Sequence, residues 1–141
     1  MSDARAGTVT PIAPPLLLAS AHEAQWSESA DVVVVGWGAA GACAALQARH
    51  EGASVLVIDR FEGGGASALS GGVVYAGGGT AQQREAGFSD SPELMHAYLR
   101  HEVNGVVGDD TVARFCRDSV ANLEWLEGHG VRFDATMPDH K

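Results

Sequence analysis

The chain has 141 residues, which is the size of one ordinary domain. Hydrophobic residues make up 45% and charged residues 19%, so a packed core is expected and the disordered class is not favoured. The formal net charge of −9 argues against nucleic acid or an anionic membrane as a partner, because both need clustered cations. The only lysine is Lys141, which excludes a P-loop, since that motif carries a lysine within GxxxxGK(S/T).

Residues 1–30 are rich in Ala, Ser, Thr and Pro without sustained periodicity, and we expect a flexible leader there. The apolar stretch at 12–19 is short and contains two prolines, so neither a signal peptide nor a membrane span is expected. Cys43 and Cys116 fall in segments that indicate helices, which predicts buried, reduced thiols and a cytoplasmic location. The cysteine and histidine spacings indicate no metal site.

An α/β pattern begins at Asp31. Residues 32–35 are consecutive valines, which predict a strand buried on both faces, as in a parallel sheet. The sequence GWGAAG follows, and residues 42–51 are rich in helix formers and end at Gly52, a good C-cap. Residues 53–58 predict a second buried strand, which ends at an acid. The pattern predicts a Rossmann-like βαβ unit.

A glycine-rich loop covers residues 61–80. Aliphatic residues are interleaved with its glycines, which favours an ordered loop that meets a ligand over a flexible linker. A helix is predicted next, with Ser91 as N-cap and Pro92 in the first turn, running to about Val103.

A second helix is predicted with Asp109 or Asp110 as its cap and Gly128 or Gly130 at its end. Residues 131–133 are expected to start another strand. The inward stripe of this helix is predicted to contain Val112, Phe115, Cys116, Ser119, Leu123 and Leu126.

The glycines at 36–41 point to dinucleotide binding. Gly36 permits a tight turn, Gly38 lets the backbone approach a pyrophosphate, and Gly41 lets the helix pack on the strand. The helix N-terminus then directs free N–H groups and its positive dipole end at the phosphates. Asp59, 18 residues after Gly41, can accept hydrogen bonds from a ribose diol. A structural glycine turn in an unrelated α/β protein is the alternative.

The loop after Asp59 favours FAD over NAD, because its backbone amides and small hydroxyls can line an extended diphosphate and a flat ring. NADP is disfavoured, since the carboxylate would repel a 2′-phosphate even though Arg60 is adjacent.

These segments carry a resemblance to a known class: DVVVVGWGAAGACAAL, VLVIDR and GGGASALSGGVVYAGGGT. They resemble the start of the FAD-dependent oxidoreductases of the fumarate reductase/succinate dehydrogenase flavoprotein class. SALSGGVVYAGGGTAQQ and GFSDSPELMHAYL most resemble its 3-ketosteroid dehydrogenase-like members. The resemblance covers residues 31–133. Asp59 departs from the more common Glu, and Ser67 from the more common Thr.

The resemblance implies FAD as cofactor and hydride transfer between a substrate carbon and flavin N5, on a small-molecule, 3-ketosteroid-like substrate. It also implies that residues 31–141 form the N-terminal part of an FAD-binding domain, without a substrate-capping domain. The implied cofactor-binding residues are Gly36, Gly38, Ala39, Ala40, Gly41, Asp59, Arg60, Ser67, Ala68, Ser70, Gly71 and Gly72.

The catalytic residues are not identified from the sequence. Tyr75 lies in the glycine-rich loop, and two roles are open for it: contact with the flavin, or packing against other side chains. Tyr98 is expected to be structural. Because the class is considerably longer, we expect no turnover by the isolated chain. Two interpretations remain open: the FAD-binding portion of a dehydrogenase or reductase, and a truncated fragment that binds FAD weakly or not at all. An NAD-binding module of a larger assembly is less favoured.

Overall fold

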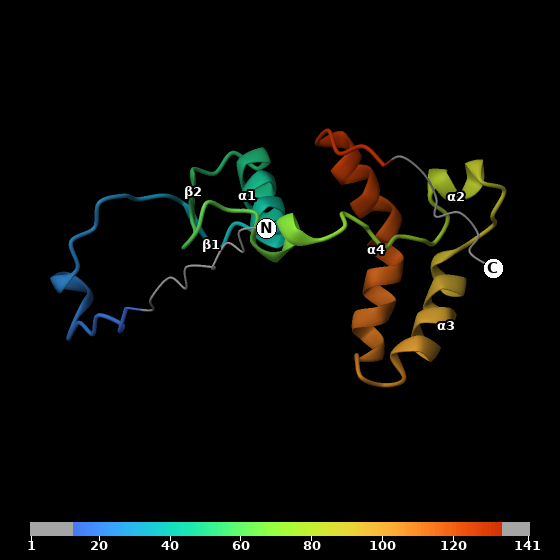
Figure 1. The fold of residues 1–141 in the computed structure, drawn as a ribbon, viewed down its shortest axis with the longest axis horizontal. Coiled ribbons are helices and arrows are strands. Elements are labelled where there is room, and N and C mark those ends of the chain that lie inside the picture. The colour runs from blue at the N-terminus through green and yellow to red at the C-terminus, as the bar shows by residue number, and fades with distance from the viewer. Residues whose placement is uncertain (1–12, 134–141) are drawn as a thin grey trace, which may run out of the picture. The chain divides into compact units, whose positions relative to one another are not determined.

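The computed structural model of the chain describes residues 13–133 (Figure 1). The chain divides into two compact units, Met1–Gly71 and Gly72–Lys141. Residues 1–12 of the predicted leader lie outside the described part. The fold combines helices with a small parallel sheet.

The first unit contains one βαβ arrangement. Strands β1 (Val32–Val35) and β2 (Val55–Ile58) pair in parallel, with Val32 opposite Val55 and Val35 opposite Ile58. Helix α1 (Ala39–His50) connects them and contacts both strands. The short 3₁₀ helices η1 (Ala21–Glu23) and η2 (Gly65–Leu69) flank this arrangement in the sequence.

Helix α1 begins three residues before the predicted start at residue 42, because Gly38 is its N-cap and Ala39 and Ala40 already belong to its first turn. Its end agrees with the prediction: Gly52 follows the C-cap with φ of +90°, a conformation that favours glycine.

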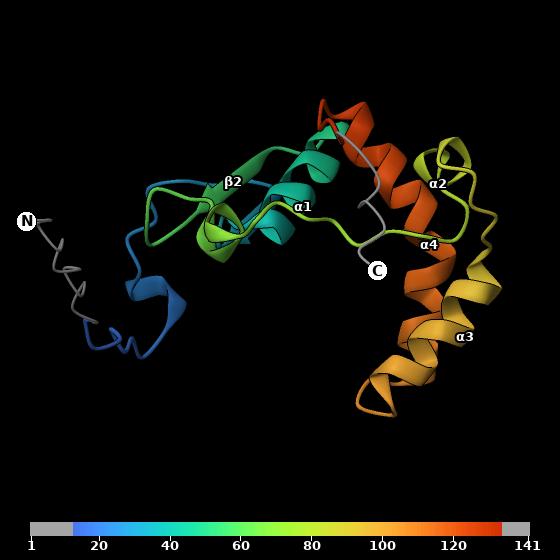
Figure 2. The same cartoon turned by 45° about the vertical axis from the view of Figure 1, so that its right-hand side comes forward.

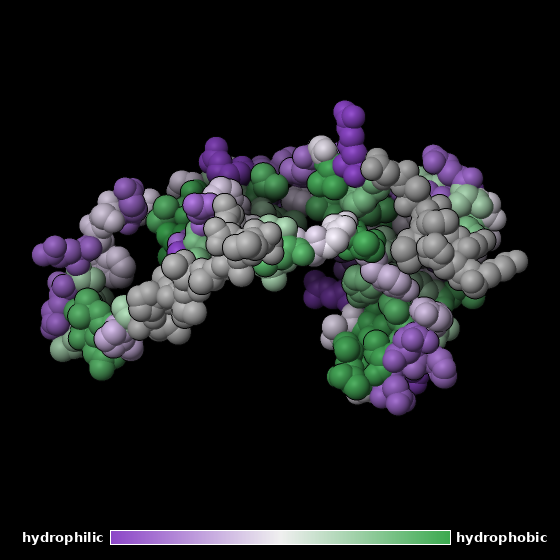
Figure 3. Space-filling model, viewed as in Figure 1, coloured by the Kyte–Doolittle hydropathy of each residue, from purple (hydrophilic) through white to green (hydrophobic). Residues whose placement is uncertain are grey.

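The predicted burial of both faces of the first strand is wrong. Val33 is 52% exposed and Val35 81% exposed, and in the second strand Ile58 is 45% exposed. The reason is that, within residues 13–71, α1 is the helix that packs on both strands, so one face of the sheet is covered. The apolar side chains on the other face of the strands therefore remain at the surface. Figure 3 shows apolar residues at the surface in other parts of the molecule as well.

The second unit contains three helices, α2 (Ala81–Glu85), α3 (Pro92–Val103) and α4 (Asp109–Gly128). Figures 1 and 2 show α3 and α4 side by side, joined by a short turn. Ser91 caps α3 as predicted, since its side chain accepts a hydrogen bond from the Leu94 amide. The core of this helix pair consists of Met95, Val112 and Cys116, with Leu99 and Val103 packed against it.

Several details of the α4 prediction need correction. Its N-cap is Gly108, while Asp109 and Asp110 lie in the first turn, where the helix dipole favours acids. Four of the six predicted inward residues are buried, whereas Phe115 is 41% exposed and stacks on Tyr75, and Leu126 is half-buried. Residues 131–133 form no strand.

The two thiols also differ. Cys116 is buried as predicted, and burial raises the pKa of its thiol, whereas Cys43 is only half-buried. Both cysteines are free, and each lies on a helix.

Helix α2 lies beyond the predicted elements, although Thr-x-x-Gln at its start is a capping-box pattern. The Thr80 hydroxyl accepts from the Gln83 amide at 3.1 Å, and the Gln83 side chain accepts from the Thr80 amide at 3.0 Å. Thr80 is 3% exposed, so its polar groups depend on these partners.

We therefore expect Thr80→Ala to lower the free energy of unfolding by about 1 kcal/mol, because the cap is lost. Urea unfolding followed by far-ultraviolet circular dichroism measures this. The control is Thr111→Ala on the exposed side of α4, where little change is expected. Equal losses in both variants would contradict the capping role.

Candidate functional site

The glycine turn, residues 36–41, joins the end of β1 to α1. Gly36 has φ of +99°, and its amide donates to the Ile58 carbonyl at 2.8 Å, so the turn starts beside the end of β2. At Gly41 a Cβ would lie 1.9 Å from the Gly36 carbonyl oxygen and 3.3 Å from Val34 Cγ1. Only a glycine permits this close approach of helix and strand, as predicted for Gly41.

The N-terminus of α1 presents unpaired backbone donors. Within residues 13–133, the amides of Gly38, Ala40 and Gly41 have no hydrogen-bond partner. The Ala39 amide donates to Ser67 Oγ at 3.2 Å. Such a cluster of N–H groups at a helix N-terminus favours a bound anion.

Gly38 faces open space at this cluster. A Cβ placed on it would have its nearest neighbours, the Gly64 carbonyl oxygen and Ser67 Oγ, at 3.9 Å. Its backbone, with φ of −89° and ψ of −170°, is one that any residue adopts. Among residues 13–133, neither the backbone conformation nor a neighbouring atom requires a glycine at this position, and the space beside it is open to a ligand.

Asp59 connects the end of β2 to the glycine turn. Its Oδ2 accepts from the Trp37 amide and its Oδ1 from the Phe61 amide at 2.7 Å. These bonds lower the pKa of the Asp59 carboxyl, the bond from Trp37 contributing most. Each carboxylate oxygen has a second lone pair, so the side chain can still accept hydrogen bonds from a ligand.

The loop after Phe61 lies against the glycine turn. The Gly64 amide donates to the Trp37 carbonyl at 2.6 Å, and a Cβ on Gly65 would lie 3.4 Å from Gly38 Cα. Together with the bond from Ala39 to Ser67, these contacts bring residues 63–67 to the N-terminus of α1.

The structure thus brings together seven of the predicted residues: Gly36, Gly38, Ala39, Ala40, Gly41, Asp59 and Ser67. Arg60 instead has its guanidinium 5.4 Å from the centre of the Phe61 ring. Ala68 packs beside Gly64, Ser70 Oγ donates to the Ser67 carbonyl at 2.8 Å, and Gly71 is exposed. Gly72 is the first residue of the second unit. For all twelve residues, the role in cofactor binding stays a prediction.

Trp37 and residues 63–65 are further members of the site. The run of three glycines in the sequence was a signal for an unusual backbone conformation, and all three have positive φ. Nothing in the sequence indicated that the aromatic residue of the glycine turn would contact this loop.

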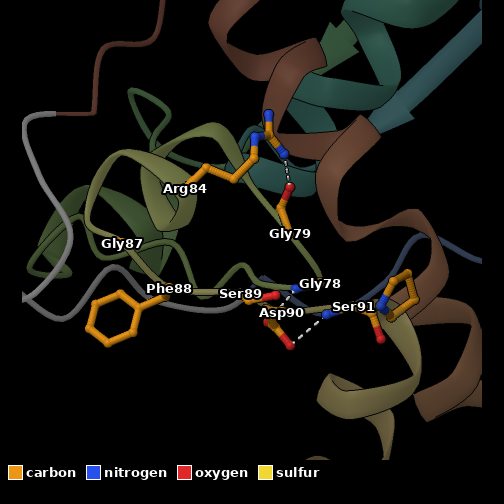
Figure 4. A pocket seen from close by; sticks show the side chains of 9 residues that line it. Gly78, Gly79, Arg84, Gly87, Phe88, Ser89, Asp90 and Ser91 are labelled. Carbon is orange, nitrogen blue, oxygen red and sulfur yellow. Dashed lines mark hydrogen bonds between the residues drawn. The ribbon is translucent and has the colours of Figure 1, made fainter.

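The second unit has an open pocket of about 460 Å³ between α2 and the start of α3 (Figure 4). Its charged side chains hold the surrounding backbone. Asp90 accepts from the amides of Gly78 at 2.7 Å and Ser91 at 2.8 Å, and the Arg84 guanidinium donates to the Gly79 carbonyl. These bonds indicate a structural role for the pocket walls.

The two tyrosines lie in the second unit. The Tyr75 ring stacks on Phe115 with centroids 6.4 Å apart, and burial, followed by the charges of nearby groups, raises its pKa. Packing, one of the two alternatives for Tyr75, is thus observed within this unit. Tyr98 is 56% exposed on α3.

The hydrogen bonds to Asp59 predict an acid-dependent contribution to stability. Because its pKa is lowered in the folded chain, the contribution is present above the ordinary carboxyl pKa and is lost as the pH falls through the folded value. We expect Asp59→Asn to be less stable than the parent chain at pH 7, with the difference shrinking towards pH 3. Urea midpoints across this range measure the difference, and one that stayed constant would contradict the effect.

Comparison with known proteins identifies the class. Residues 31–140 match the family described as FAD binding domain, and the chain belongs to this family. The predicted cofactor, FAD, is confirmed at the level of the family. The predicted resemblance to flavin-dependent steroid dehydrogenases and fumarate reductases is likewise confirmed.

Particular relatives narrow the class. The chain is 60% identical over 134 residues to 3-oxo-5-alpha-steroid 4-dehydrogenase of Comamonas testosteroni, covering 95% of this chain and 25% of that protein. The crystal structure of 3-ketosteroid-delta4-(5alpha)-dehydrogenase from Rhodococcus jostii RHA1 in complex with 4-androstene-3,17-dione matches 82% of this chain and 24% of that chain, with TM-score 0.77 and 42% identity. A flavocytochrome c3 fumarate reductase in an open conformation gives TM-score 0.66 and 33% identity, over 77% of this chain and 19% of that chain.

The chain therefore spans about a quarter of the length of each of these two steroid dehydrogenases. As for membranes, the helices in residues 13–133 include none with both the length and the apolar character needed to cross one.

Proposed function

We propose that this chain provides the dinucleotide-binding part of a flavin-dependent dehydrogenase or reductase that acts on a 3-ketosteroid-like substrate. The observation that carries the proposal is a cluster of amides at Gly38, Ala40 and Gly41 that have no hydrogen-bond partner among residues 13–133. At Gly38 the position of a Cβ is also open. The match of residues 31–140 to the FAD binding domain family supports FAD as the group that these amides receive.

The residues fit the diphosphate of FAD. Backbone N–H groups at a helix N-terminus suit its negative charge. Ser67 accepts a hydrogen bond from the Ala39 amide through its oxygen, so its own hydroxyl proton is available for a phosphate oxygen. Asp59 keeps acceptor capacity for a ribose diol in addition to its two bonds to backbone amides.

We also assign Arg60, Ala68, Ser70, Gly71 and Gly72, which follow Asp59 in the sequence, to the proposed cofactor site. When bound, FAD supplies a hydride acceptor and donor, at flavin N5, for a substrate carbon. This chain's residues contribute binding and orientation: amides hold the diphosphate and the acid holds the ribose.

We further propose that residues 31–141 are the N-terminal part of a Rossmann-like FAD-binding domain, preceded by a leader at 1–30. The parallel pair β1–β2, connected by α1, supports this assignment. The names of the relatives support a steroid as the substrate class. Two of them are steroid dehydrogenases, and each matches most of this chain. The steroid chemistry in those names belongs to relatives of which this chain covers about a quarter.

The test is a fluorescence titration of the purified chain with FAD, repeated with ADP and with riboflavin as competitors. Because the site that we propose is built around the diphosphate and ribose, ADP should compete with FAD and riboflavin should not. NADP⁺ should compete poorly, since Asp59 would repel its 2′-phosphate. Absence of FAD binding would favour the alternative, a fragment that does not hold the cofactor. If riboflavin displaced FAD and ADP did not, the assignment of the site would be refuted.

A further inference from the structure

Trp37 contacts each part of the candidate site. Its amide donates to Asp59 Oδ2, at the end of β2, and its carbonyl accepts from the Gly64 amide at 2.6 Å. Its own position is the second residue of the glycine turn. The backbone of one residue therefore ties the turn to the acid and to the loop that follows it.

The indole of Trp37 lies on the backbone of this loop. A Cβ on Gly63 would lie 3.0 Å from Cε3 and 3.2 Å from Cδ2 of the ring, closer than side-chain atoms normally pack. Gly63 also has φ of +98°, so glycine is required there for two reasons. Trp37 as a whole is 51% exposed, so the residue packs on this loop and also reaches the surface.

The contact between the Trp37 indole and Gly63 affects the groups that would donate hydrogen bonds to a ligand. Residues 63–67 place Gly65 close to Gly38 and bring Ser67 Oγ to the Ala39 amide. Three positive-φ glycines in a row make this segment intrinsically pliable, because glycine has many alternative conformations. An aromatic ring packed on its backbone restricts those alternatives.

We propose that Trp37 is a positioning residue of the dinucleotide site, whose indole holds residues 63–67 against the glycine turn. The inference rests on the proposed function for the ligand of the site, but the packing itself is independent of that ligand. Ser67 is then held where its hydroxyl accompanies the amides of α1, so the indole favours binding by reducing the ordering that the loop must undergo.

The experiment compares Trp37→Ala and Trp37→Phe with the parent chain in two measurements. The first is hydrogen exchange of the Gly64 amide without FAD; the bond to the carbonyl of residue 37 belongs to the backbone and is available in all three chains. The second is the FAD dissociation constant. Trp26→Ala is the matched control, because this tryptophan is 78% exposed in the same unit.

We expect Trp37→Ala to accelerate exchange at Gly64 by about tenfold and to weaken FAD binding by about tenfold, because the loop opens more often. Trp37→Phe should restore most of both, and Trp26→Ala should change neither. Unchanged exchange in Trp37→Ala would overturn the inference, whether or not FAD binds. Accelerated exchange in a chain whose parent form does not bind FAD would instead support the packing role and refute the proposed function.

Discussion

Gly38→Val is expected to weaken FAD binding by at least about 100-fold, which corresponds to about 2.7 kcal/mol, while the chain stays folded. The valine side chain would project from the backbone beside the amides of Ala40 and Gly41, which lack partners within residues 13–133 and where we propose the diphosphate. In the described part of the chain, the atoms nearest to its Cβ lie 3.9 Å away, and φ of −89° is acceptable for valine. The loss should therefore appear in binding and not in stability.

Two measurements separate these effects: FAD titration and urea unfolding of the same preparations. Gly108→Val is a matched control, because Gly108 also has negative φ and a Cβ there meets no atom within 4 Å. This control should bind FAD as the parent chain does. Parent-like affinity in Gly38→Val would refute the placement of the diphosphate at the glycine turn.

Gly41→Ala, in contrast, is expected to lower the stability of the fold. Its Cβ would lie 1.9 Å from the carbonyl oxygen and 3.0 Å from the carbonyl carbon of Gly36. Both are backbone atoms, so neither can rotate aside, and α1 must move away from the end of β1. We expect a loss of about 3 kcal/mol or more in the free energy of unfolding, at the upper end for overpacking.

The loss is measured by urea unfolding of Gly41→Ala followed by circular dichroism. FAD affinity should fall as well, because the turn and the helix N-terminus shift together. Gly38→Ala is the control, since the same methyl group meets only ordinary contacts there. Parent-like stability of Gly41→Ala would show that the helix and strand do not approach as closely as the structure has them.

Local signals predicted the first unit well. Four valines, a spaced set of glycines, a helix-forming run and a second apolar run correspond to β1, the turn, α1 and β2. Each depends on chemistry within a few residues. The burial of the strands could not be predicted in this way, because it depends on which layers cover the sheet, and valine runs occur on half-covered strands too.

Contacts distant in sequence account for the rest. Ser67 was predicted from a resemblance, but its bond to the Ala39 amide joins residues 28 apart, and no local pattern specifies such a bond. Phe115 has the spacing of an inward residue and is nevertheless 41% exposed, with Tyr75 stacked on it. The capping-box pattern at the start of α2 could have predicted this helix, although the run of glycines before it favours a loop.

The measurement that tests the central claim most directly is a titration of the ¹⁵N-labelled chain with FAD, followed by amide chemical shifts. A diphosphate on the helix N-terminus must perturb most strongly the amides of Gly38, Ala40 and Gly41, together with the amides bonded to Asp59. The account predicts this pattern, and its loss in Gly38→Val. Shifts confined to residues 78–92, around the pocket of the second unit, or no shifts at saturating FAD, would contradict it.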